Sequence, residues 1–278
     1  MSYKIVVDSC CDLPPKYHKD EHFEFIPLGL EIGDYFVSDD ENFDQKDYIA
    51  RVAASETCAK SACPSPDRYM KAYETDADNV YVITLSSKLS GSYNSALLGK
   101  DLYHEEKGDK NIFIIDSESA SSGEALFAFK VEELEAKGLS FDEIVKQIED
   151  YRTGMSTYFV LDNLDTLRKN GRLTGMKALV ASTLNIKPVC GSNHGEIVQR
   201  GQGMGIKKAL VKMAELIARE SKDPAEKILV IAHCNCYERA MVVKSLIEAR
   251  VELKDIVVVD TAGLSTTYAG DGGIIVAV

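Results

Sequence analysis

The sequence predicts an α/β protein of two domains: an α/β/α domain with a mostly parallel sheet, followed by an α/β domain with a mixed sheet. Continuous runs of Val and Ile carry the first part of this prediction, because the strands of a parallel sheet are covered on both faces. These runs alternate with stretches whose apolar residues recur at the period of a helix. The chain has 278 residues, 45% of them hydrophobic, which is enough for two ordinary domains with a sizeable core.

Three buried strands are predicted in the first domain, and each ends in a polar turn. They are YKIVVDS at 3–9, VYVITL at 80–85 and NIFIIDS at 111–117. Helices are predicted from SPDRYMKAYE, SYNSALLGKDLYHEE, GEALFAFKVEELEAKG and SFDEIVKQIEDYRTG. The early stretch FEFIPLGLEIGDYFVSD predicts an extended pair with a turn at Gly33 and Asp34.

The character of the sequence changes near residue 153, which divides the predicted domains 1–153 and 154–278. Beyond this point strands and turns are predicted from STYFVLDN, IKPVCGSNHGEIVQR and DIVVVDTAGLSTTYAGDGGIIVAV. Amphipathic helices are predicted from KKALVKMAELIARES and CYERAMVVKSLIEARVE. Few helices separate these strands, which favours a mixed sheet with helices on one face. The glycine-rich RGQGMG at 200–205 is interpreted as a flexible turn.

Charge and targeting signals limit the partners and the compartment. The net charge is −12, from 32 Lys and Arg against 44 Asp and Glu, which argues against nucleic acid as a partner. The opening MSYKIVVDSCC does not resemble a signal peptide, and no run approaches 18 apolar residues. We therefore expect a cytoplasmic protein without membrane insertion, and a transient membrane contact stays open.

The seven cysteines suit reduced thiols rather than a disulfide framework. The cluster HCNC, with His233, Cys234 and Cys236, follows the predicted strand KILVIA. Zinc sites use four ligands at other spacings, so we interpret this cluster as small residues at the end of a strand. Neither a metal nor a cofactor is expected.

Polar residues collect where the three predicted parallel strands end, in the turns DSCCDL, LSSKLSGSYNSA and DSESASSGEA. The loop AKSACPSP at 59–66 leads into a helix and forms a fourth candidate wall. Each turn alone is explained by N-capping, because Ser and Asp are favoured there. The carboxyl ends of parallel strands share one edge of a sheet, where helix N-termini present free N–H groups. Together the turns therefore predict a site for an anion, either a phosphate or a carboxylate.

The motifs of several enzyme classes are missing from the sequence. It contains no G-x-x-x-x-G-K-[ST] loop and no G-x-S-x-G elbow, and its five histidines form no pattern of a catalytic base. No catalytic residue is predicted, and the expected class is a binding protein rather than an enzyme.

The segment SSKLSGSYNSA resembles the Ser-x-Leu-Ser-Gly-Thr/Ser-Tyr motif of the DegV family, a family of bacterial fatty-acid-binding proteins. Other matching segments appear in family order from residue 5 to about 190: VVDSCCDLP, KSACPSP, IIDSESASSGEA, LDNLDTLRKNGRLTG and NIKPV. The resemblance implies a long-chain fatty acid held between two domains, with its tail buried in apolar core. It also implies a separate fatty acid kinase, which receives the fatty acid and makes acyl phosphate.

Carried over by position, the resemblance assigns the carboxylate to Ser61 and Ser90, with the backbone around Gly91 and Ser92. Arg172 matches a family Arg on the kinase-facing surface. Its alternative role is that of a cation near a helix C-terminus.

The sequence departs from the family pattern at two places. Tyr268 in YAGDGG stands where the family has a His that assists the carboxylate. A phenol can donate one hydrogen bond to the ligand there, but it is not cationic near neutral pH. The family's second Arg, expected after GEIV, is missing, although Arg200 is nearby and is a second candidate, beside Arg172, for the partner-facing surface. Both departures weaken kinase coupling more than lipid binding. Two alternatives stay open, an enzyme acting on an acyl or phosphorylated small molecule and a regulatory lipid-binding protein uncoupled from a kinase.

Overall fold

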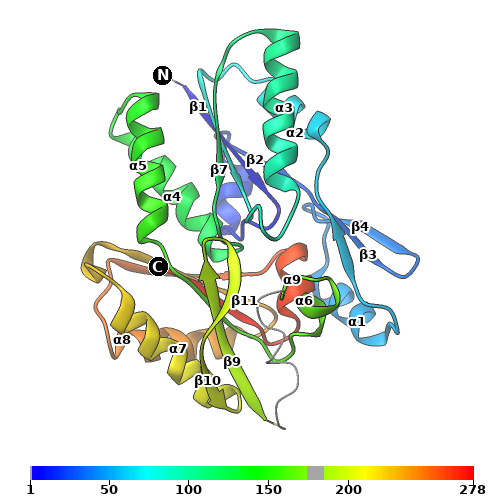
Figure 1. Cartoon of the computed structure of the whole chain (residues 1–278), viewed down its shortest axis with the longest axis vertical. Coiled ribbons are helices and arrows are strands. Elements are labelled where there is room, and N and C mark those ends of the chain that lie inside the picture. The colour runs from blue at the N-terminus through cyan, green and yellow to red at the C-terminus, as the bar shows by residue number, and fades with distance from the viewer. Residues whose placement is uncertain (1, 174–184) are drawn as a thin grey trace.

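The computed structural model describes residues 2–173 and 185–278, and Figure 1 shows their arrangement. The first sheet has four parallel strands in the order β2-β1-β6-β7. Every residue of the central strand β6 is buried, as its continuous apolar run predicts. The strands are β1 (Tyr3–Asp8), β2 (Phe23–Ile26), β6 (Asn79–Thr84) and β7 (Asn111–Asp116).

Helices cover both faces of this sheet, which confirms the predicted α/β/α arrangement (Figure 1). α2 (Pro66–Tyr73) and α3 (Ser92–Lys107) pack on one face. α4 (Ser122–Ala136) and α5 (Phe141–Gly154) pack on the other, together with the 3₁₀ turn η1 (Pro15–Lys19). Side-chain caps begin α2 and α5: the Ser65 hydroxyl accepts a hydrogen bond from the Arg68 N–H, and the Ser140 hydroxyl accepts one from the Glu143 N–H.

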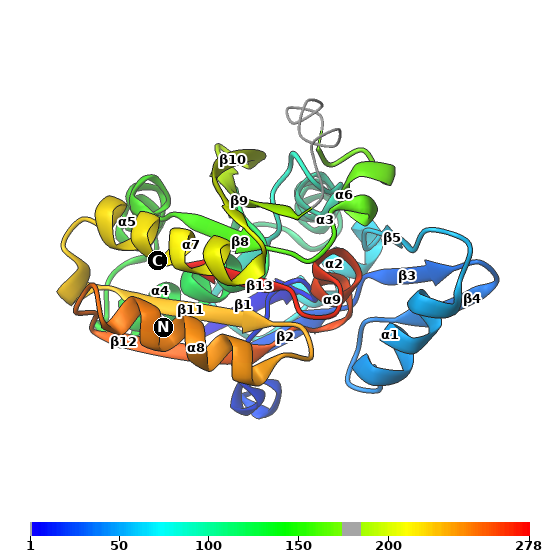
Figure 2. The same ribbon diagram turned by 90° about the horizontal axis from the view of Figure 1, so that it is seen from below.

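A small antiparallel sheet stands beside the four-stranded sheet, in the order β4-β3-β5 (Figure 2). β3 (Gly29–Ile32) and β4 (Tyr35–Ser38) form a hairpin, which confirms the predicted extended pair. Gly33 has a φ of +58° in its turn, a conformation that favours glycine. β5 (Lys60–Ala62) pairs with β3, and α1 (Gln45–Ala54) lies between β4 and β5 in the chain.

The second large sheet has six strands in the order β10-β9-β8-β13-β11-β12. β11 and β12 are parallel and the other described neighbours are antiparallel, so the predicted mixed sheet is confirmed. The strands are β8 (Thr157–Val160), β9 (Ile186–Asn193), β10 (Glu196–Met204), β11 (Ile228–His233), β12 (Asp255–Asp260) and β13 (Ile274–Ala277). The helical segments are α6 (Asp165–Lys169), α7 (Ile206–Glu220), η4 (Pro224–Glu226), α8 (Tyr237–Glu248) and α9 (Gly263–Ala269).

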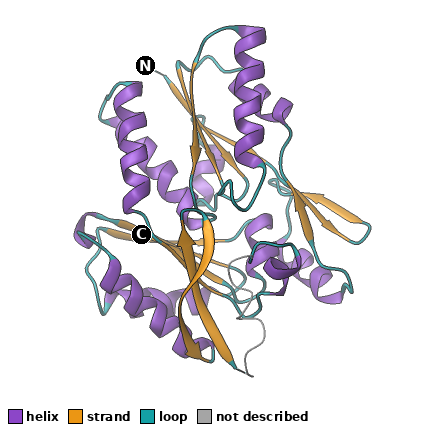
Figure 3. Cartoon of the chain, viewed as in Figure 1, coloured by secondary structure: helices purple, strands orange, loops and turns teal. Residues whose placement is uncertain are grey.

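α4 lies between the two large sheets (Figures 1 and 3). One face of the helix packs on β1 and β6, and the other packs on β11 and β13. α7 and α8 cover the opposite face of the second sheet. The division of the chain at residue 153 stays a prediction, because α4 belongs to the packing of both sheets.

Two predictions for the second half of the chain are wrong. RGQGMG is not a flexible turn, because residues 200–204 continue strand β10. Its glycines let β10 pass close to α7: a Cβ at Gly203 would lie 2.2 Å from the backbone nitrogen of Ala209. The turn lies earlier, at His194 and Gly195, which both have positive φ. The segment GLSTTYA, predicted among strands and turns, forms α9.

The HCNC cluster has the predicted place at the end of β11. His233 and Cys234 are buried and Cys236 is half-buried. Of the matched family segments, LDNLDTLRKNGRLTG extends over residues 174 and 175, which lie outside the described residues. None of the described helices combines the length and the apolar character that crossing a bilayer requires.

Candidate functional site

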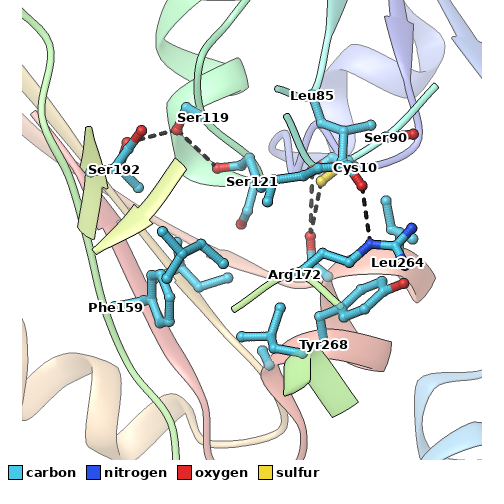
Figure 4. A pocket seen from close by; sticks show the side chains of 18 of the residues that line it. Cys10, Leu85, Ser90, Ser119, Ser121, Phe159, Arg172, Ser192, Leu264 and Tyr268 are labelled. Atoms are coloured by element: carbon cyan, nitrogen blue, oxygen red, sulfur yellow. Dashed lines mark hydrogen bonds between the residues drawn. The ribbon is translucent and has the colours of Figure 1, made fainter. Parts of the chain in front are cut away.

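A mostly apolar cavity lies where the carboxyl ends of the first sheet's strands face the second sheet (Figure 4). The loops after β1, β6 and β7 form one wall, and β8, β9, β10 and β13 with α6 and α9 form the other. Its apolar lining comprises Leu28, Leu85, Leu89, Phe159, Leu161, Leu167, Ile197, Leu264 and Ile275. The cavity therefore lies at the sheet edge where the sequence predicts a site.

Ser61 and Tyr268 come from distant parts of the chain and meet at one side of the cavity. Ser61 lies on β5 and Tyr268 on α9, and their side-chain oxygens are 3.0 Å apart. Two facing hydroxyls share a single hydrogen bond, so one of the two O–H protons remains available to a further acceptor. The pair can therefore donate to a carboxylate placed beside it.

Ser90 also lines the cavity, whereas its neighbours in the predicted site do not. The Ser92 hydroxyl is buried 3.1 Å from the Ser90 hydroxyl, and the Ser92 N–H donates to Ser90 Oγ at 3.2 Å. Gly91 is the residue before α3, and a Cβ there would approach Cys63 Sγ to 3.0 Å. Gly91 thus lets the loop before α2 pack closely, and Ser92 orients Ser90.

Arg172 brings a cation to the same side of the cavity. Its Nε donates to the carbonyl oxygen of Leu89 at 3.1 Å, and an Nη donates to that of Asn170. The guanidinium lies 6.0 Å from the centre of the Tyr268 ring. Figure 4 shows Arg172 and Tyr268 together on this side.

Arg200 is not brought to the cavity with the other predicted residues. It lies on β10 and pairs with Glu220 of α7 at 2.5 Å, above the ring of Tyr158. Partial burial raises the pKa of Glu220, but hydrogen bonds from Tyr158, Arg200 and Arg219 outweigh this effect and lower the pKa to about 2. The prediction that Arg200 faces a partner remains untested.

Several lining residues with polar groups were not predicted individually. Ser119 and Thr157 place their hydroxyl oxygens 2.6 Å apart, and Ser192 donates to the carbonyl oxygen of Glu118 at 2.6 Å. The turn DSESASSGEA contains Glu118 and Ser119, so the sequence indicated this wall without singling out either residue. Thr157 and Ser192 carry no local signal, because they reach the cavity only through the strand order of the second sheet.

Three buried carboxyl groups lie directly behind the cavity wall. Burial raises the pKa of Asp8 to about 6, against hydrogen bonds from the N–H groups of Leu85 and Cys10, both at 3.0 Å. Burial raises the pKa of Asp12 to about 7, although it accepts from Ala262 N–H at 2.6 Å and from the Ser121 hydroxyl at 2.5 Å.

Glu124 is the third of these carboxyl groups. Burial, followed by the charge of Asp8, raises its pKa, and its Oε2 has no donor among the described residues. Burial therefore favours the protonated form of both Asp8 and Glu124.

A metal could be held by Asp8, Cys10 and Glu124, the group that the described residues offer for this purpose. Their ligand atoms lie within 4.8 Å of one another, and all three residues are buried. Metal ligands must lose their protons, and burial raises the pKa of the Cys10 thiol and of both carboxyl groups. The cluster thus fits a protonated structural group better than a metal centre.

A protein-family model matches residues 2–278, and its description is "Uncharacterised protein, DegV family". The chain belongs to the DegV family. A DegV domain-containing protein of Streptococcus gordonii is 36% identical over 278 residues, covering 99% of this chain and 98% of that one. The family resemblance found in the sequence is thereby confirmed.

Solved structures of other DegV proteins match the whole fold. One from Ruminococcus gnavus, described with vaccenic acid, has a TM-score of 0.97 and 53% identity, covering 100% of this chain and 99% of that one. The Streptococcus pneumoniae Fatty Acid Kinase (Fak) B3 protein, loaded with linoleic acid, has a TM-score of 0.90 and 33% identity over 100% and 99% of the two chains. A Eubacterium eligens DegV protein loaded with heptadecanoic acid has a TM-score of 0.90 and 27% identity, covering 99% of each chain.

Proposed function

We propose that this protein binds one long-chain fatty acid in the cavity, without catalysing a reaction on it. The carboxylate lies at Ser61, Ser90 and Tyr268, and the tail lies along the apolar lining. The observation that carries the proposal is one apolar cavity with hydroxyl donors and the Arg172 guanidinium on one side. The fatty acids in the three related structures support it.

The two parts of such a ligand contribute differently. Each buried CH₂ contributes about 0.8 kcal/mol, so a long tail supplies most of the affinity. The carboxylate needs only a few donors, and these fix the direction in which the acid enters. The site thus requires no metal or cofactor.

The proposed function is tested by the stability of the delipidated protein. A ligand that binds the native state alone must stabilise it, so a saturating long-chain fatty acid should raise the midpoint of thermal unfolding. The corresponding fatty alcohol, which keeps the tail and loses the charge, should raise it less. If none of the long-chain fatty acids raises the midpoint of thermal unfolding, the proposed function is wrong.

We further propose that the protein presents its fatty acid to a fatty acid kinase in the cytoplasm. The Fak B3 relative supports the partner, and Arg172 lies beside the proposed head group. All seven cysteines are free thiols, which suits a reducing compartment. Tyr268 and the ion-paired Arg200 leave little positive charge for an acyl phosphate, so we expect weak coupling.

Weak coupling can be measured as acyl-phosphate formation by a DegV-associated kinase at saturating fatty acid. Tyr268→His should increase the rate, because an imidazolium can bind the added phosphate charge, while fatty-acid affinity changes little. Arg172→Ala should decrease it. Equal and efficient turnover by all three proteins would contradict this placement of the kinase-facing surface.

A further inference from the structure

The side of the cavity away from Arg172 and Tyr268 is polar as well. Ser119 follows β7, and Thr157 is the first residue of β8. Both residues line the cavity, as do Phe159 and Gly191. Figure 4 shows Ser119 and Ser192 across the cavity from Arg172 and Tyr268. An alkyl tail that starts at the head group would therefore meet hydroxyls along its course.

The hydrogen bonds at this place leave one proton without a good acceptor. Ser119 Oγ and Thr157 Oγ1 lie 2.6 Å apart, so one O–H proton lies between them. The other proton has only a distant acceptor among the described residues, the carbonyl oxygen of Ala120 at 3.5 Å from Ser119 Oγ. The Ser192 proton, in contrast, is committed to the Glu118 carbonyl at 2.6 Å.

This arrangement is unfavourable beside a plain alkyl chain. Ser119 is 3% and Thr157 is 7% exposed, so bulk water does not satisfy them. A buried O–H proton without a near acceptor costs free energy, whereas an oxygen atom on the ligand would accept it. A ligand hydroxyl can also donate in return, to the lone pairs of either side chain.

We infer that the cavity prefers a long-chain fatty acid that carries a hydroxyl group along its chain, placed against Ser119 and Thr157. The inference rests on the proposed function, since it takes the head group to lie at Ser61 and Tyr268. It adds a substrate class, hydroxylated fatty acids, and two residues that determine specificity. A site built to hydrogen-bond a hydroxyl discriminates against the analogue that lacks it.

The test is a calorimetric titration of the delipidated full-length protein. The probes are octadecanoic acid and a series of its monohydroxy derivatives, with the hydroxyl at successive positions from mid-chain to the end. At least one derivative should bind about fivefold more tightly than octadecanoic acid, the effect of one neutral hydrogen bond. Thr157→Val and Ser119→Ala should each abolish this preference, measured in each variant as the ratio of its affinities for the hydroxy acid and for octadecanoic acid.

Thr153→Val on the exposed face of α5 is the matched control, and it should keep the preference. Thermal unfolding shows which variants fold. If only one of the two cavity variants folds, that variant alone is sufficient to test the preference. The inference is overturned if every hydroxy acid binds more weakly than octadecanoic acid, or if the preference persists in a folded variant. Failure of octadecanoic acid and of all derivatives to bind would instead contradict the proposed function itself.

Discussion

At the scale of single residues, the proposed head-group site depends on two hydroxyls that are 207 positions apart in the chain. Ser61 and Tyr268 were both assigned through the family resemblance, but the contact between them was not predicted. The sequence also did not predict that Ser92 turns away from the cavity to hold Ser90. Local motifs indicate which residues gather at a sheet edge, whereas their direction depends on packing.

The head-group residues can be tested one hydroxyl at a time. Ser61→Ala and Tyr268→Phe should each weaken fatty-acid binding by about 1 to 3 kcal/mol, because a charged acceptor loses a donor in a largely dry site. A fatty-acid methyl ester, without that charge, should distinguish the variants from the wild type much less. Titration of the delipidated proteins measures both effects.

Ser265→Ala is the control, because Ser265 also lines the cavity but directs its hydroxyl to the Cys10 carbonyl oxygen at 3.4 Å. It should change fatty-acid affinity little. Unchanged affinity in both Ser61→Ala and Tyr268→Phe would move the carboxylate to another part of the cavity.

At the scale of elements, α4 shows what a sequence pattern can and cannot establish. The run GEALFAFKVEELEA predicts a helix, and its apolar residues occur all round it rather than on one face. Such a helix must be buried on several sides. Which sheets cover it cannot be read from the pattern, because the second sheet is built from residues far along the chain.

The carboxyl groups around the start of α4 predict a pH dependence of stability. Burial raises the pKa of Glu124, that of Asp8 to about 6 and that of Asp12 to about 7. A raised carboxyl pKa stabilises the fold fully below the unfolded pKa, near 4, and this contribution is lost as pH rises through the folded pKa. The free energy of unfolding should thus be higher at about pH 5.5 than at about pH 8.

Urea denaturation at the two pH values measures this difference. Glu124→Gln should reduce it, because the amide stays neutral and can still donate to Asp8. Glu149→Gln, at an exposed position of α5, should leave it unchanged. A wild-type protein that is equally stable at both pH values, or more stable at the higher one, would show that these carboxyl groups are ionised in the folded state.

The glycines of β10 give a second prediction at this scale. Gly203→Ala should destabilise the fold by about 1 to 3 kcal/mol, because its Cβ would overlap the backbone of α7. Gly154→Ala is the matched control, since a Cβ there has no neighbour within 4 Å. Chemical denaturation compares the two. Equal stability of the two variants would indicate that β10 moves freely away from α7.

At the scale of the whole molecule, the sequence predicted both sheets, and the family resemblance implied a ligand between them, but the residues of the apolar lining were not predicted. Continuous apolar runs establish a parallel sheet, and the change of pattern after residue 153 indicates the mixed one. The pairing of β8 with β13, which brings Phe159 and Ile275 to the cavity, joins segments more than a hundred residues apart. The spacing of apolar residues within a strand does not encode which strand it pairs with. The residues that form the apolar lining could therefore not be predicted from the sequence.

The measurement that tests the central claim most directly is the lipid content of the protein as purified. Native mass spectrometry should give a complex heavier than the 30.6 kDa chain by the mass of one fatty acid. Denaturing extraction of the same sample should release long-chain fatty acids in about a one-to-one ratio to protein. Protein that carries no fatty acid, and takes up none when a long-chain acid is added, would contradict the account.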